Sequence, residues 1–357
     1  MKLFVCQNCT NVLYFENIRC ERCGLRLGYL PEASTLSALE EEGSAWRALA
    51  SPGRSVRFCA NAEQDACNWL VPADEDDAFC RACRHNGTIP NLSDQWNLTH
   101  WRKIEEAKHR LFYSLIRLDL PLATRAEDPE HGLLFRFLAD PPAESGPKVM
   151  TGHDNGIITI ALVEADDAER ERRRTLMGEP YRTLVGHFRH EVGHHYWDFL
   201  VRDGGRLEPF RALFGDERED YGQALKRHHA NGPPGDWQDR FVSTYATAHP
   251  WEDFAETWAH YLHIVDASET ACAFGVSVEA GVHAGGDLRA EVDFDPYRAQ
   301  SIRALVDSWL PLTFALNCIN RSMGIPDLYP FVLTGPVIQK LGFIHEIVHA
   351  QRRGSDA

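Results

Sequence analysis

The chain has 357 residues, 44% of them hydrophobic and 25% charged, which is enough for a sizeable core and for two or three domains. Its formal net charge of −15 argues against nucleic-acid and anionic-membrane binding, because both need clustered Lys and Arg. The first residues, MKLFVCQNCT, lack the apolar run of a signal peptide, and no segment has the apolar length expected of a membrane span. We therefore expect a cytoplasmic protein, in which reduced cysteines bind metal rather than form disulfides.

The chain begins with a cysteine module in residues 1–28. It contains two Cys-x-x-Cys pairs, Cys6 with Cys9 and Cys20 with Cys23. Two such pairs form a tetrahedral thiolate cage with no open position, which is typical of structural zinc. A redox role is the alternative, but the surrounding sequence lacks the strand–helix–strand pattern of thioredoxin-like proteins.

Residues 29–53 are predicted to be a linker, or alternatively a short helix followed by a turn, because they combine a proline, an acidic run and a Ser-Pro-Gly turn. A second cysteine module follows in residues 54–95, and a module of this size needs its metal to fold. Its spacing is less regular, so three cysteines with His85 form an alternative ligand set. Acidic residues outnumber basic ones here, which favours a protein over a nucleic acid as a partner of the two modules. The expected zinc ligands of the second cysteine module are Cys59, Cys67, Cys80 and Cys83.

Residues 96–357 are predicted to form the main domain. The polar segment 215–235 is expected to be an excursion across the surface, and Cys272 and Cys318 are expected to be buried thiols. Hydrophobic periodicity and the positions of Pro and Gly predict helices at 101–118, from 180 to about 204, at 250–265 and at 337–349, and a strand at 156–162.

The second of these helices carries the sequence His190-Glu191-Val192-Gly193-His194. Residues four apart share one face of a helix, so the two histidines can bind one Zn²⁺. Zinc lowers the pKa of a bound water towards 7, and Glu191 can then accept its proton as a general base. The alternative is a chance match, because the H-E-x-x-H pattern is short.

The pattern occurs a second time, at His345-Glu346-Ile347-Val348-His349. Catalytic zinc usually takes three protein ligands and leaves one position for water. Too little chain follows this copy to supply a third ligand from another helix. We therefore interpret the second copy as an ordinary helix face.

Two acidic residues on the helix at 250–265 complete the predicted site. Glu252 is the expected third zinc ligand, and Glu256, four residues later on the same face, is expected to accept a hydrogen bond from a ligand imidazole. Asp198 lies one turn beyond His194 on the same face. Asp198 is expected to contact a metal ligand without binding the metal itself, or alternatively to replace Glu252 as the third ligand.

The stretch from Tyr245 to Glu256 resembles the glutamate helix of gluzincins, in particular the anthrax lethal factor type. In that type a Tyr seven residues before the ligand Glu stabilises the oxyanion, so the resemblance implies this role for Tyr245; a core or interface tyrosine is the alternative. Over nearly its full length the chain also resembles a bacterial family of zinc-binding metallopeptidases with an N-terminal zinc ribbon. The residues that carry this resemblance are Cys6–Cys23, Gly186–His195 and Pro250–Glu256.

These observations predict an α+β, zincin-like metallopeptidase domain behind one or two zinc-ribbon modules, with one catalytic and one or two structural Zn²⁺. The strand at 156–162 is expected to be the cleft edge, to which an extended peptide adds as another strand. The expected substrate is a peptide or protein, with a protein partner at the ribbon, and no nucleic acid or membrane. The alternatives are a zinc-ribbon adaptor whose zincin domain only binds a partner, and a zinc hydrolase of non-peptide amides.

Overall fold

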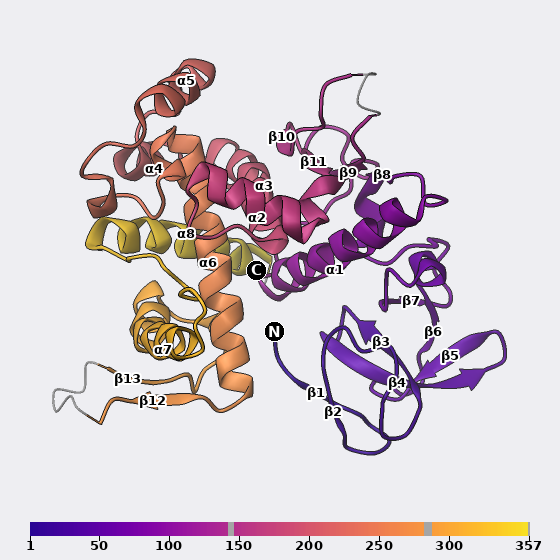
Figure 1. The fold of residues 1–357 in the computed structure, drawn as a ribbon. Helices are drawn as coiled ribbons and strands as arrows, with labels where there is room; N and C mark the ends of the chain where they lie inside the picture. The colour runs from indigo at the N-terminus through magenta and orange to yellow at the C-terminus, as the bar shows by residue number, and fades with distance from the viewer. Residues whose placement is uncertain (142–145, 282–287, 356–357) are drawn as a thin grey trace. The chain divides into compact units, whose positions relative to one another are not determined.

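The structure, a computed structural model, describes residues 1–141, 146–281 and 288–355 (Figure 1). It contains two compact units, one made of residues 1–117 and 121–173 and the other of residues 118–120 and the chain from Arg174 onward. Helices and strands are both abundant, which confirms the α+β class. The cysteine modules lie in the first unit, and both H-E-x-x-H segments lie in the second.

The N-terminal part of the first unit is a short hairpin followed by a five-stranded antiparallel sheet. The hairpin pairs β1 (Phe4–Val5) with β2 (Val12–Leu13). The sheet has the order β3-β4-β5-β6-β7, and one core cluster collects a side chain from each of its strands. Its strands are β3 (Arg26–Leu30), β4 (Thr35–Glu42), β5 (Ala45–Ala48), β6 (Ser55–Phe58) and β7 (Leu70–Pro72).

The prediction of a linker or a short helix at residues 29–53 is wrong, because this segment supplies β4, β5 and the end of β3. Leu36 and Leu39 of β4 are buried, and the acidic run continues the same strand. Glu40 in that run forms an ion pair with Arg47 on β5. A cross-strand pair of opposite charges stabilises the extended conformation, so a sequence that resembles a linker becomes the sheet that joins the two cysteine modules.

A second sheet of the first unit has the order β10-β11-β9-β8. The strand predicted at 156–162 is confirmed as β11 (Ile157–Ala161), whose Ile158 and Ile160 are fully buried. It pairs antiparallel with β10 (Gly152–Asp154) and parallel with β9 (Leu134–Leu138), and β8 (Asn86–Thr88) pairs with the far side of β9. The expectation that β11 is a cleft edge is therefore wrong, because both of its sides are already hydrogen-bonded to neighbouring strands.

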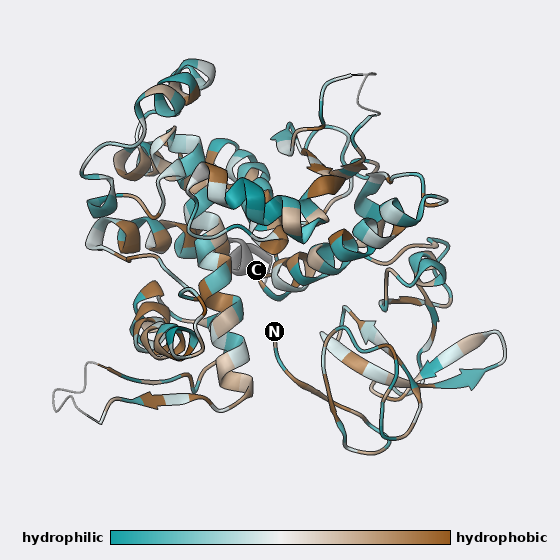
Figure 2. Ribbon diagram, viewed as in Figure 1, coloured by the Kyte–Doolittle hydropathy of each residue, from teal (hydrophilic) through white to brown (hydrophobic). Residues whose placement is uncertain are grey.

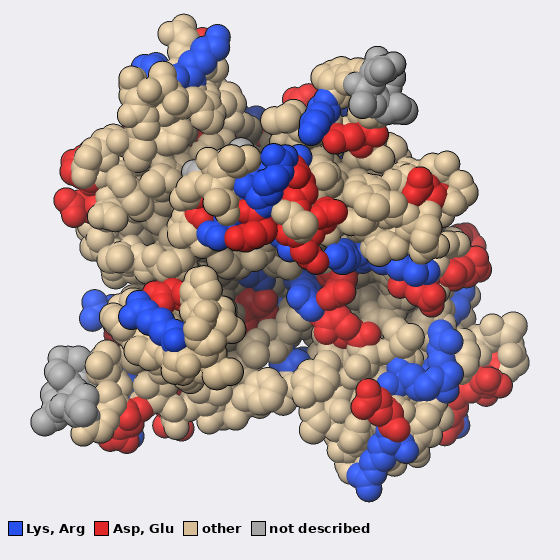
Figure 3. All heavy atoms as spheres, in the orientation of Figure 1, with Lys and Arg blue, Asp and Glu red and all other residues tan. Residues whose placement is uncertain are grey.

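Two helices accompany this sheet in the sequence. The predicted amphipathic helix is confirmed as α1 (Gln95–Arg117), which buries Trp101, Ile104 and Leu111. The following helix, α2 (Asp167–Met177), is hydrophilic along most of its length (Figure 2). Its basic and acidic side chains lie next to each other on the face shown in Figure 3, and they form ion pairs within the helix.

The second unit is mainly helical. The helices predicted around the two motifs and at 250–265 are confirmed as α3 (Leu184–Trp197), α6 (Pro250–Ala273) and α8 (Gly335–Ser355). α3 begins after Pro180 because the side chain of Thr183 caps it, accepting a hydrogen bond from the Gly186 amide at 3.0 Å. The remaining elements are a π-helical turn (Asp198–Arg202), α4 (Leu207–Phe214), α5 (Tyr221–Asn231), the hairpin of β12 (Ser277–Glu279) and β13 (Arg289–Glu291), and α7 (Ile302–Ser322).

α3 and α6 approach each other closely at Gly193. A Cβ atom at this position would lie 3.1 Å from Ala255 Cα and 3.2 Å from the side chain of Trp258. The glycine inside the first H-E-x-x-H segment therefore lets the two backbones pack together. This contact brings the histidines of α3 to the acidic face of α6.

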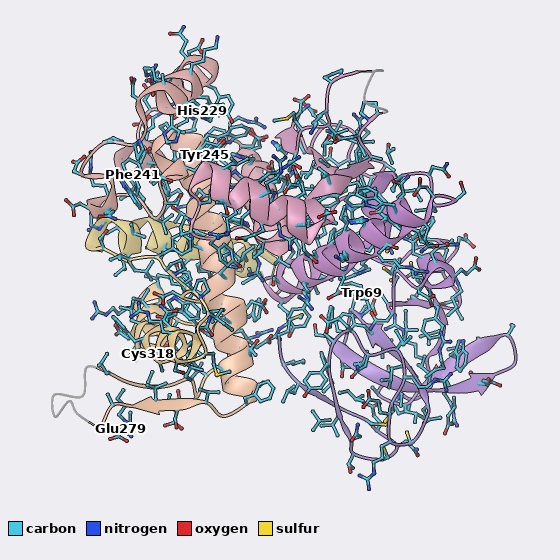
Figure 4. The ribbon with its side chains drawn as sticks, viewed as in Figure 1. Trp69, His229, Phe241, Tyr245, Glu279 and Cys318 are labelled. Carbon is cyan, nitrogen blue, oxygen red and sulfur yellow. The ribbon has the colours of Figure 1, made fainter. Side chains whose placement is uncertain are left out.

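α7 has the length and hydropathy of a helix that could cross a membrane. Leu305, Trp309 and Leu312 of this helix are buried in the second unit, whereas Phe314 and Cys318 are exposed (Cys318 is labelled in Figure 4). A core helix of a globular protein passes the same test, so α7 assigns no location. The expectation of a buried thiol at Cys318 is wrong, because this residue lies on the exposed face of α7.

Candidate metal centre and active site

Three predicted ligands come together where α3 meets α6. The Nε2 atoms of His190 and His194 lie 3.2 Å apart. Glu252 Oε2 lies 3.0 Å from His190 Nε2 and 3.6 Å from His194 Nε2. The helical spacing of four residues places the imidazoles side by side, and the close packing of the helices supplies the carboxylate.

The arrangement of these three atoms suits the binding of a metal ion better than hydrogen bonding among the atoms themselves. Glu252 is almost fully buried at 1% exposure, and its Oε2 accepts no hydrogen bond within the described residues. A buried carboxylate oxygen is normally paired. Two imidazole nitrogens and one carboxylate oxygen are the donor set of many catalytic zinc sites, in which water takes the fourth position.

Groups behind the ligands orient them. Glu256 Oε1 lies 2.7 Å from His190 Nδ1, and Ser243 donates a 2.6 Å hydrogen bond to Glu256 Oε2. The Nδ1–H group of His190 can thus donate to Glu256, which directs Nε2 at the metal position. On the other side, the ring of Trp251 lies 3.9 Å from the ring of His194. Glu256 therefore lies where the sequence predicts it, whereas Ser243 carried no signal because no local pattern marks it.

Glu191 follows His190 on α3 and is only partly exposed. Burial raises the pKa of its carboxyl group above the usual value, although His190 and His194 act in the opposite direction. A carboxylate whose pKa is nearer to neutrality is a better general base at physiological pH. Glu191 thus directly follows one of the three predicted ligands, and its raised pKa suits a group that exchanges a proton.

Tyr245 lies on a short 3₁₀ turn before α6 and is labelled in Figure 4. The centre of its ring is 5.9 Å from that of His190. Burial and the charge of Glu252 raise the pKa of Tyr245, so its hydroxyl keeps a proton at neutral pH. A protonated phenol at this position can donate a hydrogen bond to a negative charge that develops next to the metal.

Tyr221 is a site residue that the sequence analysis missed. It is the first residue of α5, in the segment expected to be a surface excursion, and its hydroxyl donates a 2.6 Å hydrogen bond to Glu252 Oε1. Asp220 caps α5, and this Asp before a helical run is the one sequence signal that could have revealed the element. Asp198, by contrast, pairs with Arg202 at 2.7 Å, and its role behind the ligands stays a prediction.

The second H-E-x-x-H segment has a different environment. His345 Nδ1 and His349 Nε2 lie 3.1 Å and 3.4 Å from the hydroxyl of Tyr261, and Glu346 is exposed. Burial lowers the pKa of His345 to about 4, which keeps it neutral. No third His, Cys, Asp or Glu donor joins the pair within the described residues. This arrangement is that of a packed helix face.

The first cysteine module gathers its four thiols in the hairpin region. Sγ of Cys6 lies 3.7 Å from that of Cys23, and Sγ of Cys9 lies 3.5 Å from that of Cys20. All four sulfur atoms lie within 4.8 Å of one another. Four thiolates at such distances fit a closed tetrahedral zinc site.

The second module also brings four thiols together, all of them buried. The alternative set of three cysteines with His85 is not the one that the structure assembles, because His85 does not belong to this group of donors within the described residues, and its Nδ1 lies 3.0 Å from the Leu133 carbonyl oxygen. A different histidine approaches the cluster: His109 Nε2 of α1 lies 3.3 Å from Cys67 Sγ and 3.5 Å from Cys83 Sγ. No sequence pattern predicts this contact, because His109 belongs to a helix outside the cysteine module. The four thiols belong to Cys59, Cys67, Cys80 and Cys83.

The fold and these donor sets define a class of protein: a cysteine-rich region with two candidate zinc sites, followed by a helical unit with a candidate His-His-Glu metal centre. A family model described as "Putative zinc-binding metallo-peptidase" matches residues 97–347, and a zinc-ribbon domain model matches residues 3–94. The chain belongs to this zinc-binding metallopeptidase family, which confirms the resemblance noted in its sequence.

Relatives of similar length exist in mycobacteria. The chain is 43% identical over 349 residues to an uncharacterized protein of Mycobacterium bovis, and the match covers 98% of this chain and 95% of the relative. Uncharacterized proteins from two strains of Mycobacterium tuberculosis match with the same identity and coverage. No solved structure shows significant similarity to the chain.

Proposed function

We propose that this protein is a zinc-dependent peptidase whose metal is held by His190, His194 and Glu252. The observation that carries the proposal is the convergence of these three donors with Glu191 beside them. An intact carboxylate between two metal-binding histidines is needed for hydrolysis but not for binding a partner. We infer three zinc ions per chain, with one at this centre and one in each cysteine cage.

Zinc bound at this centre would polarise the scissile carbonyl and make a water molecule acidic enough to be deprotonated near neutral pH. Glu191 accepts the proton of the attacking water and later delivers it to the leaving amine. The Tyr245 hydroxyl donates a hydrogen bond to the oxygen of the former carbonyl as that oxygen becomes negative. Glu256 keeps His190 in the tautomer and orientation that point Nε2 at the metal.

The substitution Glu191→Gln tests this mechanism. It should leave the zinc content unchanged and lower the turnover of a quenched fluorescent peptide library by about 10²–10⁴-fold, the usual loss when a general base is removed. Glu346→Gln is the matched control, because it makes the same change in the second H-E-x-x-H segment. Undiminished turnover in Glu191→Gln would refute the role of Glu191.

Zinc content per chain tests the ligand assignment separately. His190→Ala should remove one zinc ion of the three and leave the two cysteine cages filled. If this variant loses no zinc, the centre does not hold metal, and a non-catalytic adaptor is the better description. Turnover of simple amides without turnover of peptides would instead favour a hydrolase of non-peptide amides.

We further propose a cytoplasmic location, where reduced thiols remain available to zinc.

We also propose that the first ribbon binds a protein. The ribbon exposes Val5, Val12, Tyr14 and Ile18, each at least half accessible. Exposed apolar side chains of this kind favour protein over nucleic acid. If the ribbon captures protein substrates, Val12→Asp should raise KM for a protein substrate and leave KM for a short peptide unchanged. If Val12→Asp and the wild type have the same KM for the protein substrate, the first ribbon does not capture substrates.

A further inference from the structure

α5 is a thinly attached helix whose anchoring contacts lie next to the metal centre. Of its residues only Ala224 is buried. The turn before it is fixed because Glu219 accepts a hydrogen bond from His249 Nε2 at 3.1 Å through its carbonyl. Asp220 then caps the helix by accepting from the Gln223 amide at 2.8 Å. This cap places Tyr221 at the first helical position, with its ring 5.7 Å from that of Trp251.

The two carboxylate oxygens of Glu252 have different partners. Oε2 faces the imidazoles of His190 and His194, and Oε1 accepts the hydrogen bond from Tyr221 at 2.6 Å. A glutamate that binds a metal ion does so as a carboxylate. Its two oxygens are chemically equivalent until a neighbour distinguishes them, and the neighbour that does so is the Tyr221 hydroxyl.

We propose that Tyr221 is a positioning residue that makes Glu252 a one-oxygen metal ligand; this inference rests on the proposed metal centre. A carboxylate can bind zinc through one oxygen or through both. With Oε1 occupied by the phenol, Oε2 alone remains for the metal. A position that a second carboxylate oxygen would fill is then left for water and the substrate carbonyl, which a catalytic zinc site requires.

The same helix also contacts the turn that carries Tyr245. His228 Nδ1 of α5 lies 3.1 Å from Thr247 Oγ1, and the His228 ring is 6.2 Å from the ring of Tyr245. α5 therefore supports both phenols of the site, although it contributes no metal ligand itself.

The test replaces one oxygen atom, by Tyr221→Phe, and measures the metal rather than the reaction. Cobalt(II) substituted at the centre reports coordination number, because absorption in the visible region weakens when four-coordinate geometry becomes five-coordinate. We expect a weaker visible band in the variant. We also expect a zinc affinity about 10-fold or more below wild type in chelator competition, as is usual when an outer partner of a ligand is lost.

Lys226→Ala is the matched control, because Lys226 is an exposed residue of the same helix. It should leave the spectrum and the zinc affinity unchanged. In peptide hydrolysis, Tyr221→Phe should lower kcat about 10-fold or more with KM within about twofold, since the substrate contacts remain. A wild-type spectrum together with wild-type zinc affinity in Tyr221→Phe would overturn the proposal.

The outcome separates this inference from the proposed function. Altered metal properties in Tyr221→Phe, in a protein that cleaves no peptide, would support the positioning role and contradict the peptidase. Conversely, if the wild type cleaves peptides and Tyr221→Phe leaves the cobalt spectrum and the zinc affinity unchanged, the peptidase is supported and the positioning role is contradicted.

Discussion

A buried ion pair fastens α6, the helix that carries Glu252, to α8. Lys340 Nζ lies 2.6 Å from Asp253 Oδ2, and the two side chains are 6% and 0% exposed. Lys340 also donates a 2.8 Å hydrogen bond to the Arg240 carbonyl. Replacing Lys340 by Met keeps most of the side-chain volume but leaves the carboxyl group of Asp253 buried without its cation.

The expected cost follows from this burial. Breaking a buried ion pair by removing one partner typically costs about 3–5 kcal/mol, because the remaining charge is uncompensated. For a unit of roughly 150–250 residues, each kcal/mol lowers Tm by about 2–4 °C. Lys340→Met should therefore lower the Tm of the second unit by at least about 6 °C.

The assay is thermal and urea unfolding of the full-length chain, followed by circular dichroism. The double variant Lys340→Met with Asp253→Asn should recover part of the loss, because neither partner is then charged. Arg303→Ala is the control, since the Arg303–Asp307 pair on α7 is exposed and should contribute little. A free energy of unfolding within about 1 kcal/mol of wild type for Lys340→Met would refute the reasoning.

Two further predictions concern other histidines. His109→Ala removes the imidazole 3.3 Å from Cys67 Sγ and should speed the release of one zinc ion to a chelator by about 10-fold or more, whereas equal release rates would contradict that contact. The pKa of His345 is lowered from 6.5 to about 4, so between these values the unfolded chain binds a proton that the folded chain does not. Its contribution to stability is therefore complete above pH 6.5 and is lost on acidification, by up to about 1.4 kcal/mol per pH unit. His345→Gln should flatten this part of a urea-unfolding pH profile, and an unchanged slope would count against the assignment.

The parts of the site that the sequence could predict are those set by local geometry. The spacing of His190 and His194 places them on one helix face in any packing, and the same holds for Glu252 and Glu256. The pairing of these two helices was inferred from chemistry and resemblance, and Gly193 is the residue whose small size allows it.

The parts that the sequence could not predict depend on contacts between distant segments. Tyr221 lies on an exposed helix 31 residues before Glu252, and His109 reaches the second cysteine cluster from 42 residues after Cys67. No periodicity or spacing marks such residues. The prediction for residues 29–53 failed for a related reason. Glu40 and its acidic neighbours are stabilised in a strand by partners such as Arg47, and only the folded sheet brings these partners near.

The two H-E-x-x-H segments show why the motif alone does not define a metal site. Both lie on helices that pack against α6, and both present two histidines at the same spacing. To His190 and His194, α6 presents the carboxylate of Glu252; to the second pair, nine residues further along, it presents the hydroxyl of Tyr261. A neutral hydroxyl hydrogen-bonds to imidazoles but is a poor zinc ligand, whereas a carboxylate oxygen completes a three-ligand set. The residue that the facing helix contributes therefore distinguishes the candidate metal centre from the packed helix face.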